Sequence, residues 1–261
     1  MRDILHQVRL GTMPVEEAER LLQLNALEET ESASLDLLRE ARVGIPEIVY
    51  GHGKTPAQVV EIVSIFLSRQ DQAIVTRASE ETLDAVEKSF AGTCDLRVDR
   101  GAGIVVARKP GTEPARIGRR VGVITAGTTD IRVAEEARTV AEAMGCQVVT
   151  AYDVGIAGFH RHIGPLKKML QEGVDAIVVV AGMEGALPSV IASLANVPVI
   201  GVPTSTGYGF GGGGTGALTT MLQSCSLGLS VMNIDNGVGA GAYAALIARR
   251  VAAALESGGR R

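Results

Sequence analysis

The stretch that decides the fold is "RRVGVITAGTTDIRVAEEARTVAEAMGCQVVTAYDV", residues 119–154. It opens with a short apolar run, continues with apolar residues at helical spacing, and returns to a second apolar run. Gly145 closes the helical pattern at the position where glycine commonly follows the end of a helix. Strand, helix and strand in this order predict a βα repeat with parallel strands.

The same alternation continues to the end of the chain. Further strands are expected at residues 175–182, 197–205 and 229–235, and further helices at 164–173, 184–195, 215–224 and 236–256. Five strands alternating with helices predict a doubly wound, mostly parallel α/β sheet. We assign this domain to residues 117–261.

A smaller α/β domain, residues 1–116, is expected before it. Strands are predicted at residues 47–51, 72–77, 94–100 and 103–109, and helices at 55–69 and 79–90. Thr55 and Ser79 are the expected N-caps, with Pro56 in the first turn. Two short helical patterns at residues 3–27 predict a helical arm. Residues 109–118, with two prolines and two glycines, are the expected linker.

Composition narrows the class of protein. The 261 residues are 46% hydrophobic and 3% aromatic, with 32 glycines, which suits a parallel sheet with a Val, Ile, Leu and Ala core. A net charge of −4 argues against a nucleic-acid surface. The charged N-terminus does not resemble a signal peptide, and no apolar run reaches the ~18 residues that span a bilayer. We therefore expect a cytoplasmic protein without a nucleic-acid or membrane partner.

Ligands of open parallel sheets bind at the carboxyl ends of the strands. The loops expected there are residues 126–130, 153–162, 181–189 and 203–216, and each combines glycine with hydroxyl, carboxylate or basic side chains. Their convergence predicts a ligand site. The candidate substrate-binding residues on these loops are Thr128, Thr129, Asp130, Gly158, His160, Arg161, Gly182, Ser205, Tyr208 and Gly209.

Each loop also has a plainer interpretation. The "AGTTD" loop can hold a phosphate at a helix start, or Thr129 or Asp130 can simply cap that helix. Arg161 can bind an anion and His160 or His162 can transfer a proton, or all three can lie in a solvated loop. Glu184 can orient a substrate, move a proton, or complement a helix N-terminus.

Two glycine-rich segments lack the standard nucleotide motifs. The loop at 203–216 has no GK[ST] sequence and no GxGxxG directly after a strand, so a lid without chemistry of its own is the alternative. Lys54 in "GHGKT" is a weaker candidate, an anion contact in a turn. No HExxH sequence or Cys/His cluster indicates a metal site, whereas Mg²⁺ held by a ligand's phosphates would leave little trace.

Three cysteines are present, without the spacing of a disulfide framework. Cys225 lies in "TTMLQSCSLGLSV", residues 219–231, among small and apolar residues. Buried cysteines are usually packing residues, and from composition alone Cys225 is one too. Cys94 and Cys146, at expected strand starts, are predicted to line the core.

Several long segments resemble the LarB family. They are "GVITAGTTD", "AYDVGIAGFHR", "VVVAGMEGALPSVIASLANVPVIGVPTSTGYG" and "MLQSCSLGLSVMNIDNGVGAG", within residues 121–243. The segment "LREARVGIPEIVYGHGKT", residues 38–55, resembles the N-terminal part of the same family. More distantly, the second half resembles the PurE carboxylases, which implies a PurE-like fold for that domain.

The resemblance also implies a reaction. LarB enzymes take nicotinic acid adenine dinucleotide and CO₂ or bicarbonate, with Mg²⁺, and release pyridinium-3,5-biscarboxylic acid mononucleotide and AMP for nickel-pincer cofactor synthesis. On this sequence the family's covalent nucleophile is Cys225, and its active-site glutamate is Glu184. Asp130 and Arg161 match loop positions shared with PurE. An octamer is implied as well.

The ring chemistry explains the thiol. A pyridinium carbon does not attack CO₂, but adding a thiolate to the ring creates an enamine that does, and the thiolate then leaves. Cys225, however, follows a helix and precedes a strand, which places it at the amino end of the sheet. Either the chain bends round, or Cys225 completes a neighbouring subunit's site, which we favour. The alternative functions are a PurE-type aminoimidazole ribonucleotide carboxylase and a non-catalytic nucleotide-binding module.

Overall fold

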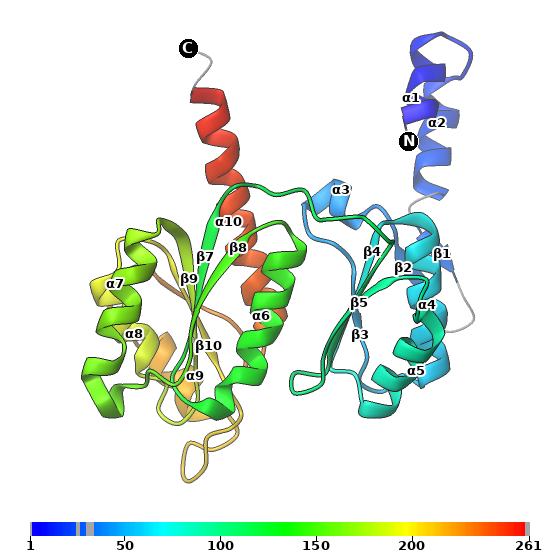
Figure 1. Cartoon of the computed structure of the whole chain (residues 1–261). Coiled ribbons are helices and arrows are strands. Elements are labelled where there is room, and N and C mark those ends of the chain that lie inside the picture. Colours follow the sequence, from blue (N-terminus) through cyan, green and yellow to red (C-terminus); the bar gives the residue numbers. More distant parts are fainter. Residues whose placement is uncertain (1, 25–26, 30–33, 259–261) are drawn as a thin grey trace. The chain divides into compact units, whose positions relative to one another are not determined.

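The computed structural model describes residues 2–24, 27–29 and 34–258 (Figure 1). The chain divides into two compact units, Met1–Thr112 and Glu113–Arg261, and each is considered by itself. The division falls within the predicted linker, residues 109–118.

The larger unit is built on a five-stranded sheet with the order β11-β10-β9-β7-β8, in which every neighbouring pair is parallel. This confirms the predicted doubly wound parallel fold. The strands are β7 (Arg120–Thr125), β8 (Gln147–Ala151), β9 (Val174–Ala181), β10 (Val199–Pro203) and β11 (Leu229–Val231). All eight residues of β9 are buried, because it is the central strand and both of its faces are covered.

Helices cover both faces of this sheet. Figure 1 shows α7, α8 and α9 on one side and α6 and α10 on the other. Their bounds are α6 (Ile131–Ala143), α7 (Ile163–Gln171), α8 (Leu187–Leu194), α9 (Thr215–Leu222) and α10 (Gly237–Gly258). One core cluster joins the first group to the sheet, with Met169, Ile191 and Met221 packed around Ile177. Gly145 follows α6 with φ +92°, as the sequence predicts.

Two glycines bring α10 unusually close to α6. A Cβ on Gly237 would lie 2.1 Å from the Val133 carbonyl oxygen, and one on Gly241 would lie 2.3 Å from that of Ala137. Gly237 and Gly241 of the last helix therefore make a close helix–helix contact within the chain. By length and composition α10 could cross a membrane. No such segment was predicted from the sequence. Its Ala240, Ala244 and Ala248 are fully buried against the rest of the unit, and 33% of the candidate window is buried.

The smaller unit has a four-stranded mixed sheet with the order β3-β4-β6-β5. Strands β3 (Ile48–Tyr50) and β4 (Gln72–Thr76) are parallel, whereas β6 (Ile104–Arg108) is antiparallel to β4 and to β5 (Asp95–Asp99). Helices α4 (Pro56–Arg69) and α5 (Glu80–Phe90) start at the predicted caps. The Thr55 and Ser79 hydroxyls accept hydrogen bonds from the backbone N–H groups of Gln58 and Thr82.

Helices α1 (Arg2–Arg9) and α2 (Val15–Leu24) form the predicted arm. Three further short elements are β1 (Leu27–Glu29), β2 (Ser34–Asp36) and α3 (Arg39–Val43). None of these three elements was predicted, because three-residue strands and a five-residue helix are too short to show a hydrophobic period.

Candidate active site

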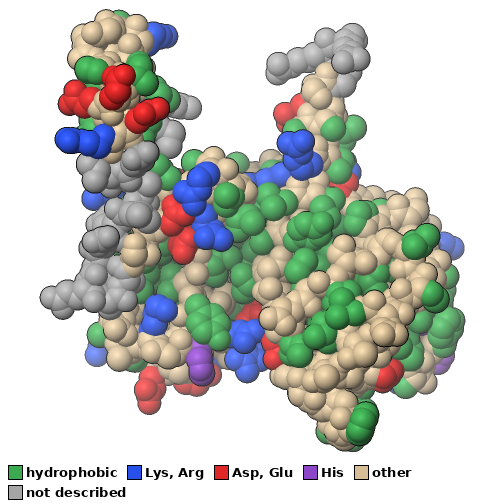
Figure 2. All heavy atoms as spheres, turned by 180° about the vertical axis from the view of Figure 1, so that it is seen from behind, with side chains coloured by type: hydrophobic (Ala, Val, Ile, Leu, Met, Phe, Trp, Pro, Cys, Tyr) green, Lys and Arg blue, Asp and Glu red, His purple; other side chains and the backbone are tan. Residues whose placement is uncertain are grey.

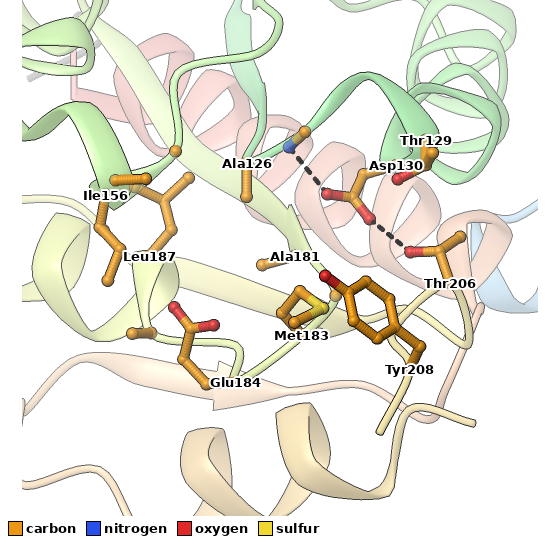
Figure 3. A pocket seen from close by; sticks show the side chains of 15 residues that line it. Ala126, Thr129, Asp130, Ile156, Ala181, Met183, Glu184, Leu187, Thr206 and Tyr208 are labelled. Carbon is orange, nitrogen blue, oxygen red and sulfur yellow. Dashed lines mark hydrogen bonds between the residues drawn. The ribbon is translucent and has the colours of Figure 1, made fainter. Parts of the chain in front are cut away.

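A pocket of about 390 Å³ lies at the carboxyl edge of the larger unit's sheet (Figure 3). This volume is in the range of small-molecule sites. The loops after β7, β8, β9 and β10 all contribute to it, so the four predicted loops do converge. The lining residues are Ala126, Gly127, Thr129, Asp130, Gly155, Ile156, Ala157, Ala181, Gly182, Met183, Glu184, Ala186, Leu187, Thr206 and Tyr208.

Asp130 ties the first of these loops to the last. Its carboxylate accepts hydrogen bonds from the Gly127 backbone N–H at 2.9 Å, the Thr204 hydroxyl at 2.7 Å and the Thr206 hydroxyl at 3.1 Å. Only 3% of the residue is exposed. A short 3₁₀ turn, η1 (Thr128–Asp130), precedes α6, and the Asp130 side chain does not cap that helix. The Asp130 carboxylate therefore caps the start of η1 through the Gly127 N–H and also bridges to the loop after β10.

The loop after β9 brings Glu184 into the pocket. A Cβ on Gly182 would lie 2.6 Å from the Thr206 hydroxyl and 2.7 Å from that of Thr204, so only glycine lets this loop pass so close to the two threonines. Met183 adopts a left-handed backbone with φ +49°, which turns the chain sharply. In Figure 3 the Glu184 carboxylate faces the space between Leu187 and Met183.

The polarity of the pocket limits what it can bind. Its two charged lining side chains, Asp130 and Glu184, are both acidic. Most of the remaining wall is apolar, from Ile156, Leu187 and Met183, with the Tyr208 ring at one side (Figure 3). A flat cationic ring fits such walls better than a phosphate, which would require a cation or free N–H groups.

Five predicted residues line this pocket: Thr129, Asp130, Gly182, Glu184 and Tyr208. Six others lie on the converging loops but do not line it: Thr128, Gly158, His160, Arg161, Ser205 and Gly209. Arg161 lies 3.8 Å from Asp153 in an exposed ion pair. Gly158 makes room for that side chain, since a Cβ there would lie 2.7 Å from the Arg161 Nε.

The structure places Cys225 outside this pocket. It is exposed in the turn between α9 and β11, in an open hollow with Ser189, Thr219 and Gln223 among its lining residues. The Val199 N–H at the start of β10 donates to the Gly228 carbonyl at 3.0 Å, so this turn reaches the amino edge of the sheet. The expected position of Cys225 is confirmed, and within one chain it does not meet the pocket.

The other two cysteines differ from Cys225. Cys146 is buried, and burial raises the pKa of its thiol to about 11. Cys94 is half-buried and packs against the core of the smaller unit. Both therefore line a core as predicted, and Cys225 is the exposed thiol.

Three of the residues that were not predicted bear on the chemistry of the site. Thr204 and Thr206 bind Asp130, and Met183 lines the pocket. The segment "TST", residues 204–206, follows directly after a strand and carries three hydroxyl groups in succession. This run of hydroxyls is the signal that could have indicated the threonines. Nothing in the sequence marked Met183, since its strained backbone depends on the tertiary contacts of the loop.

Among the described residues, no group of three or more His, Cys, Asp and Glu side chains could hold a metal ion. Lys54 belongs to the smaller unit, where its Nζ donates to the Tyr50 carbonyl at 3.0 Å.

Comparison with known proteins covers both units. Residues 27–109 match the family described as LarB/PurE-like N-terminal domain, and residues 120–258 match the family described as AIR carboxylase. An uncharacterised protein of Methanocaldococcus jannaschii is 45% identical over 252 residues, which cover 95% of this chain and 97% of that protein. The N5-carboxyaminoimidazole ribonucleotide mutase of Thermotoga maritima is 29% identical over 132 residues, 49% of this chain and 74% of the mutase.

Proposed function

Because the chain belongs to the LarB family, with a PurE-like carboxylase-type domain as its larger unit, we propose that it carboxylates and hydrolyses nicotinic acid adenine dinucleotide. The products are pyridinium-3,5-biscarboxylic acid mononucleotide and AMP, for nickel-pincer cofactor synthesis. The carboxyl group comes from CO₂ or bicarbonate. The order of the two matched domains supports this assignment.

The observation that carries the proposal is the polarity of the pocket. Asp130 and Glu184 are its charged lining side chains, and apolar groups and Tyr208 form its walls. A pyridinium ring is flat and cationic, so it gains from nearby carboxylates and from aromatic contact. The uncharged ring of an aminoimidazole would gain less from two acidic side chains.

Cys225 and Glu184 supply the proposed chemistry. The Cys225 thiolate forms a carbon–sulfur bond to the ring, and the electron pair of the broken ring π bond moves onto the nitrogen, which neutralises the cation and leaves an enamine. Carbon 5 attacks CO₂, Glu184 accepts the proton from carbon 5, and the thiolate leaves as the ring regains aromaticity. Water then attacks the pyrophosphate and AMP departs.

The loops around the pocket would hold the phosphates. We assign Thr128, Thr129 and Arg161 to them, because all three are exposed at the carboxyl edge beside the pocket. His160, Gly158, Ser205 and Gly209 remain proposed substrate contacts on the same loops. Mg²⁺ would be held mainly by the substrate's phosphates, since the described side chains form no metal cluster.

We propose that Cys225 reaches the pocket of a second copy of the chain, because within one chain it lies outside the pocket lining. Leu222 and Leu227 lie on either side of it in the sequence and are 66% and 92% exposed, so two uncovered apolar side chains accompany a hollow lined by Ser, Thr and Gln residues. Tyr208 and Phe210, on the loop beside the pocket, are also exposed. Figure 2 shows further hydrophobic side chains over the rear face of the larger unit. Exposed apolar surface of this kind is typical of oligomer interfaces and supports a homo-oligomer, and the resemblance to the LarB family implies an octamer.

Turnover tests the proposal. Incubation with nicotinic acid adenine dinucleotide and bicarbonate should release AMP and add one carboxylate to the ring, as measured by mass spectrometry. Cys225→Ser should abolish the mass gain, whereas Cys94→Ser, on a half-buried thiol of the smaller unit, should retain it. AMP release without a mass gain in the wild-type protein would refute the carboxylation.

Mixed assemblies test the shared site. Cys225→Ala and Glu184→Gln chains are co-expressed with different tags and the hybrids purified. Each hybrid contains pockets with an intact Glu184 beside neighbours with an intact Cys225, so partial activity should return. If hybrids are as inactive as the parent variants, Cys225 serves its own chain.

A PurE-type activity is the second candidate, and the similarity to the Thermotoga mutase favours it. That mutase-like chemistry needs no thiol. Conversion of N5-carboxyaminoimidazole ribonucleotide at equal rates by the wild-type protein and Cys225→Ser would establish it in place of the LarB reaction. Binding without turnover of either substrate would indicate a nucleotide-binding module.

A further inference from the structure

Aromatic and cationic side chains gather at the carboxyl edge of the smaller unit's sheet. Tyr50 ends β3, His52 and Lys54 follow it, and Arg77 follows the parallel strand β4. The register pairs Tyr50 with Thr76, and the Gly51 N–H donates to the Thr76 carbonyl at 2.7 Å. The two loops therefore lie side by side.

The Tyr50 ring is the centre of this cluster. The Arg77 guanidinium carbon lies 5.8 Å from the ring centroid, and the His52 ring meets Tyr50 edge-on with centroids 6.0 Å apart. The Lys54 Nζ donates to the Tyr50 carbonyl. Tyr50 is 48% exposed, so ring surface remains available between these cations.

The backbone holds the cluster in a fixed arrangement. A Cβ on Gly51 would lie 3.0 Å from the Ala78 Cα, and one on Gly103 would lie 2.9 Å from the Ala78 carbonyl oxygen. The Ala78 N–H also donates to the Gly103 carbonyl at 2.9 Å. Three segments are thus packed backbone to backbone, which fixes the backbone positions from which the Tyr50 and Arg77 side chains extend.

Three of the four acidic side chains on α5 pair with Arg100, and Glu81 is the fourth. Arg100 lies 2.6 Å from Glu80 and 2.9 Å from Asp84, and it also pairs with Glu87. This positive charge offsets much of the acidic charge on the exposed face of α5. Lys54 and Arg77 can then attract an anion with less opposition from the helix beside them.

We propose that this cluster, which we call the Tyr50 site, binds a nucleoside 5′-monophosphate. The base stacks on the exposed ring of Tyr50, and the phosphate binds Lys54 and Arg77. Aromatic stacking and charge-assisted hydrogen bonds are the two contacts that a nucleotide offers together. Helices α4 and α5 also begin at this edge and add partial positive charge. The proposal is independent of the carboxylation reaction, since it concerns free nucleotide at the smaller unit.

Photolabelling of the full chain separates this site from the pocket of the larger unit. The probe is 8-azidoadenosine 5′-monophosphate, and the labelled peptides are mapped by mass spectrometry. We expect label on the peptide that carries Tyr50, competed by AMP but not by adenosine or inorganic phosphate at the same concentration. Label confined to peptides of the larger unit would overturn the proposal.

Variants assign the contacts. Tyr50→Ala and Lys54→Met should each lower labelling of this peptide about tenfold or more. Lys88→Met removes an exposed charge on α5 and should leave labelling unchanged. Arg77 has a left-handed backbone with φ +50°, which asparagine tolerates. Arg77→Asn therefore removes the cation without straining the backbone, and it tests the phosphate contact if Lys54→Met unfolds. Wild-type labelling in folded Tyr50→Ala and Lys54→Met chains would contradict the assignment.

Discussion

The Asp130 bridge predicts how a conservative change should act. Asp130→Asn keeps one oxygen for the Thr204 and Thr206 hydroxyls but turns an amide NH₂ toward the Gly127 N–H. A buried donor then loses its acceptor, which costs about 1–3 kcal/mol. Each kcal/mol lowers the melting temperature of a domain of this size by about 2–4 °C, so we expect a fall of about 2–12 °C in the larger unit.

Calorimetry measures this fall, and hydrogen exchange localises it to the Gly127–Asp130 loop. The matched control is Asp95→Asn, which also removes an acceptor for a backbone N–H, that of Gly111 at 3.2 Å, but at an exposed position. It should change stability by about 0.5 kcal/mol or less. Thr204→Val should destabilise similarly and non-additively with Asp130→Asn. Unchanged stability with lost ligand binding would mean that Asp130 contacts substrate and does not bridge the loops.

Three further changes probe the larger unit. Gly241→Ala should destabilise it by about 1–3 kcal/mol, because the new Cβ meets the neighbouring helix. A Cβ on Gly164 would meet no atom within 4 Å, so the control Gly164→Ala should be neutral or stabilising. Equal losses of stability for the two variants in thermal melts would contradict this. Burial lowers the pKa of His162 below its usual value of about 6.5. As the pH falls, the unfolded chain therefore takes up a proton on this residue before the folded chain does. The stability of the larger unit should then fall as the pH drops below about 6.5. His162→Gln should flatten this dependence in melts at pH 5.5 to 7.5, and His160→Gln, on an exposed side chain, should not. Glu184→Gln should lower kcat about 10²–10⁴-fold in the AMP-release assay, and a change in KM alone would assign Glu184 to binding.

The parallel fold of the larger unit was predictable, because its strands and helices carry their own hydrophobic period, and the helix boundaries of both units were marked by single residues. Gly145, Thr55 and Ser79 ended or began helices where expected. The short elements β1, β2 and α3 depend on contacts with other segments and carry no period, so they were missed.

The candidate site was predictable as a set of loops rather than as a set of contacts. Topology alone brings the carboxyl ends of parallel strands together, which is why Thr129, Glu184 and Tyr208 line one pocket. Which side chains face inward depends on loop conformation, and Arg161 pairs with Asp153 outside the pocket lining. The position of Cys225 followed from the order of helix and strand.

The central claim is that Cys225 forms a covalent bond to the pyridinium ring. Its most direct test is rapid quenching of the protein during turnover of nicotinic acid adenine dinucleotide, followed by peptide mass spectrometry. We predict that the Cys225 peptide gains the mass of the bound substrate and that the Cys94 and Cys146 peptides do not. Full carboxylation activity in a Cys225→Ser chain, with no adduct on any cysteine, would contradict the account.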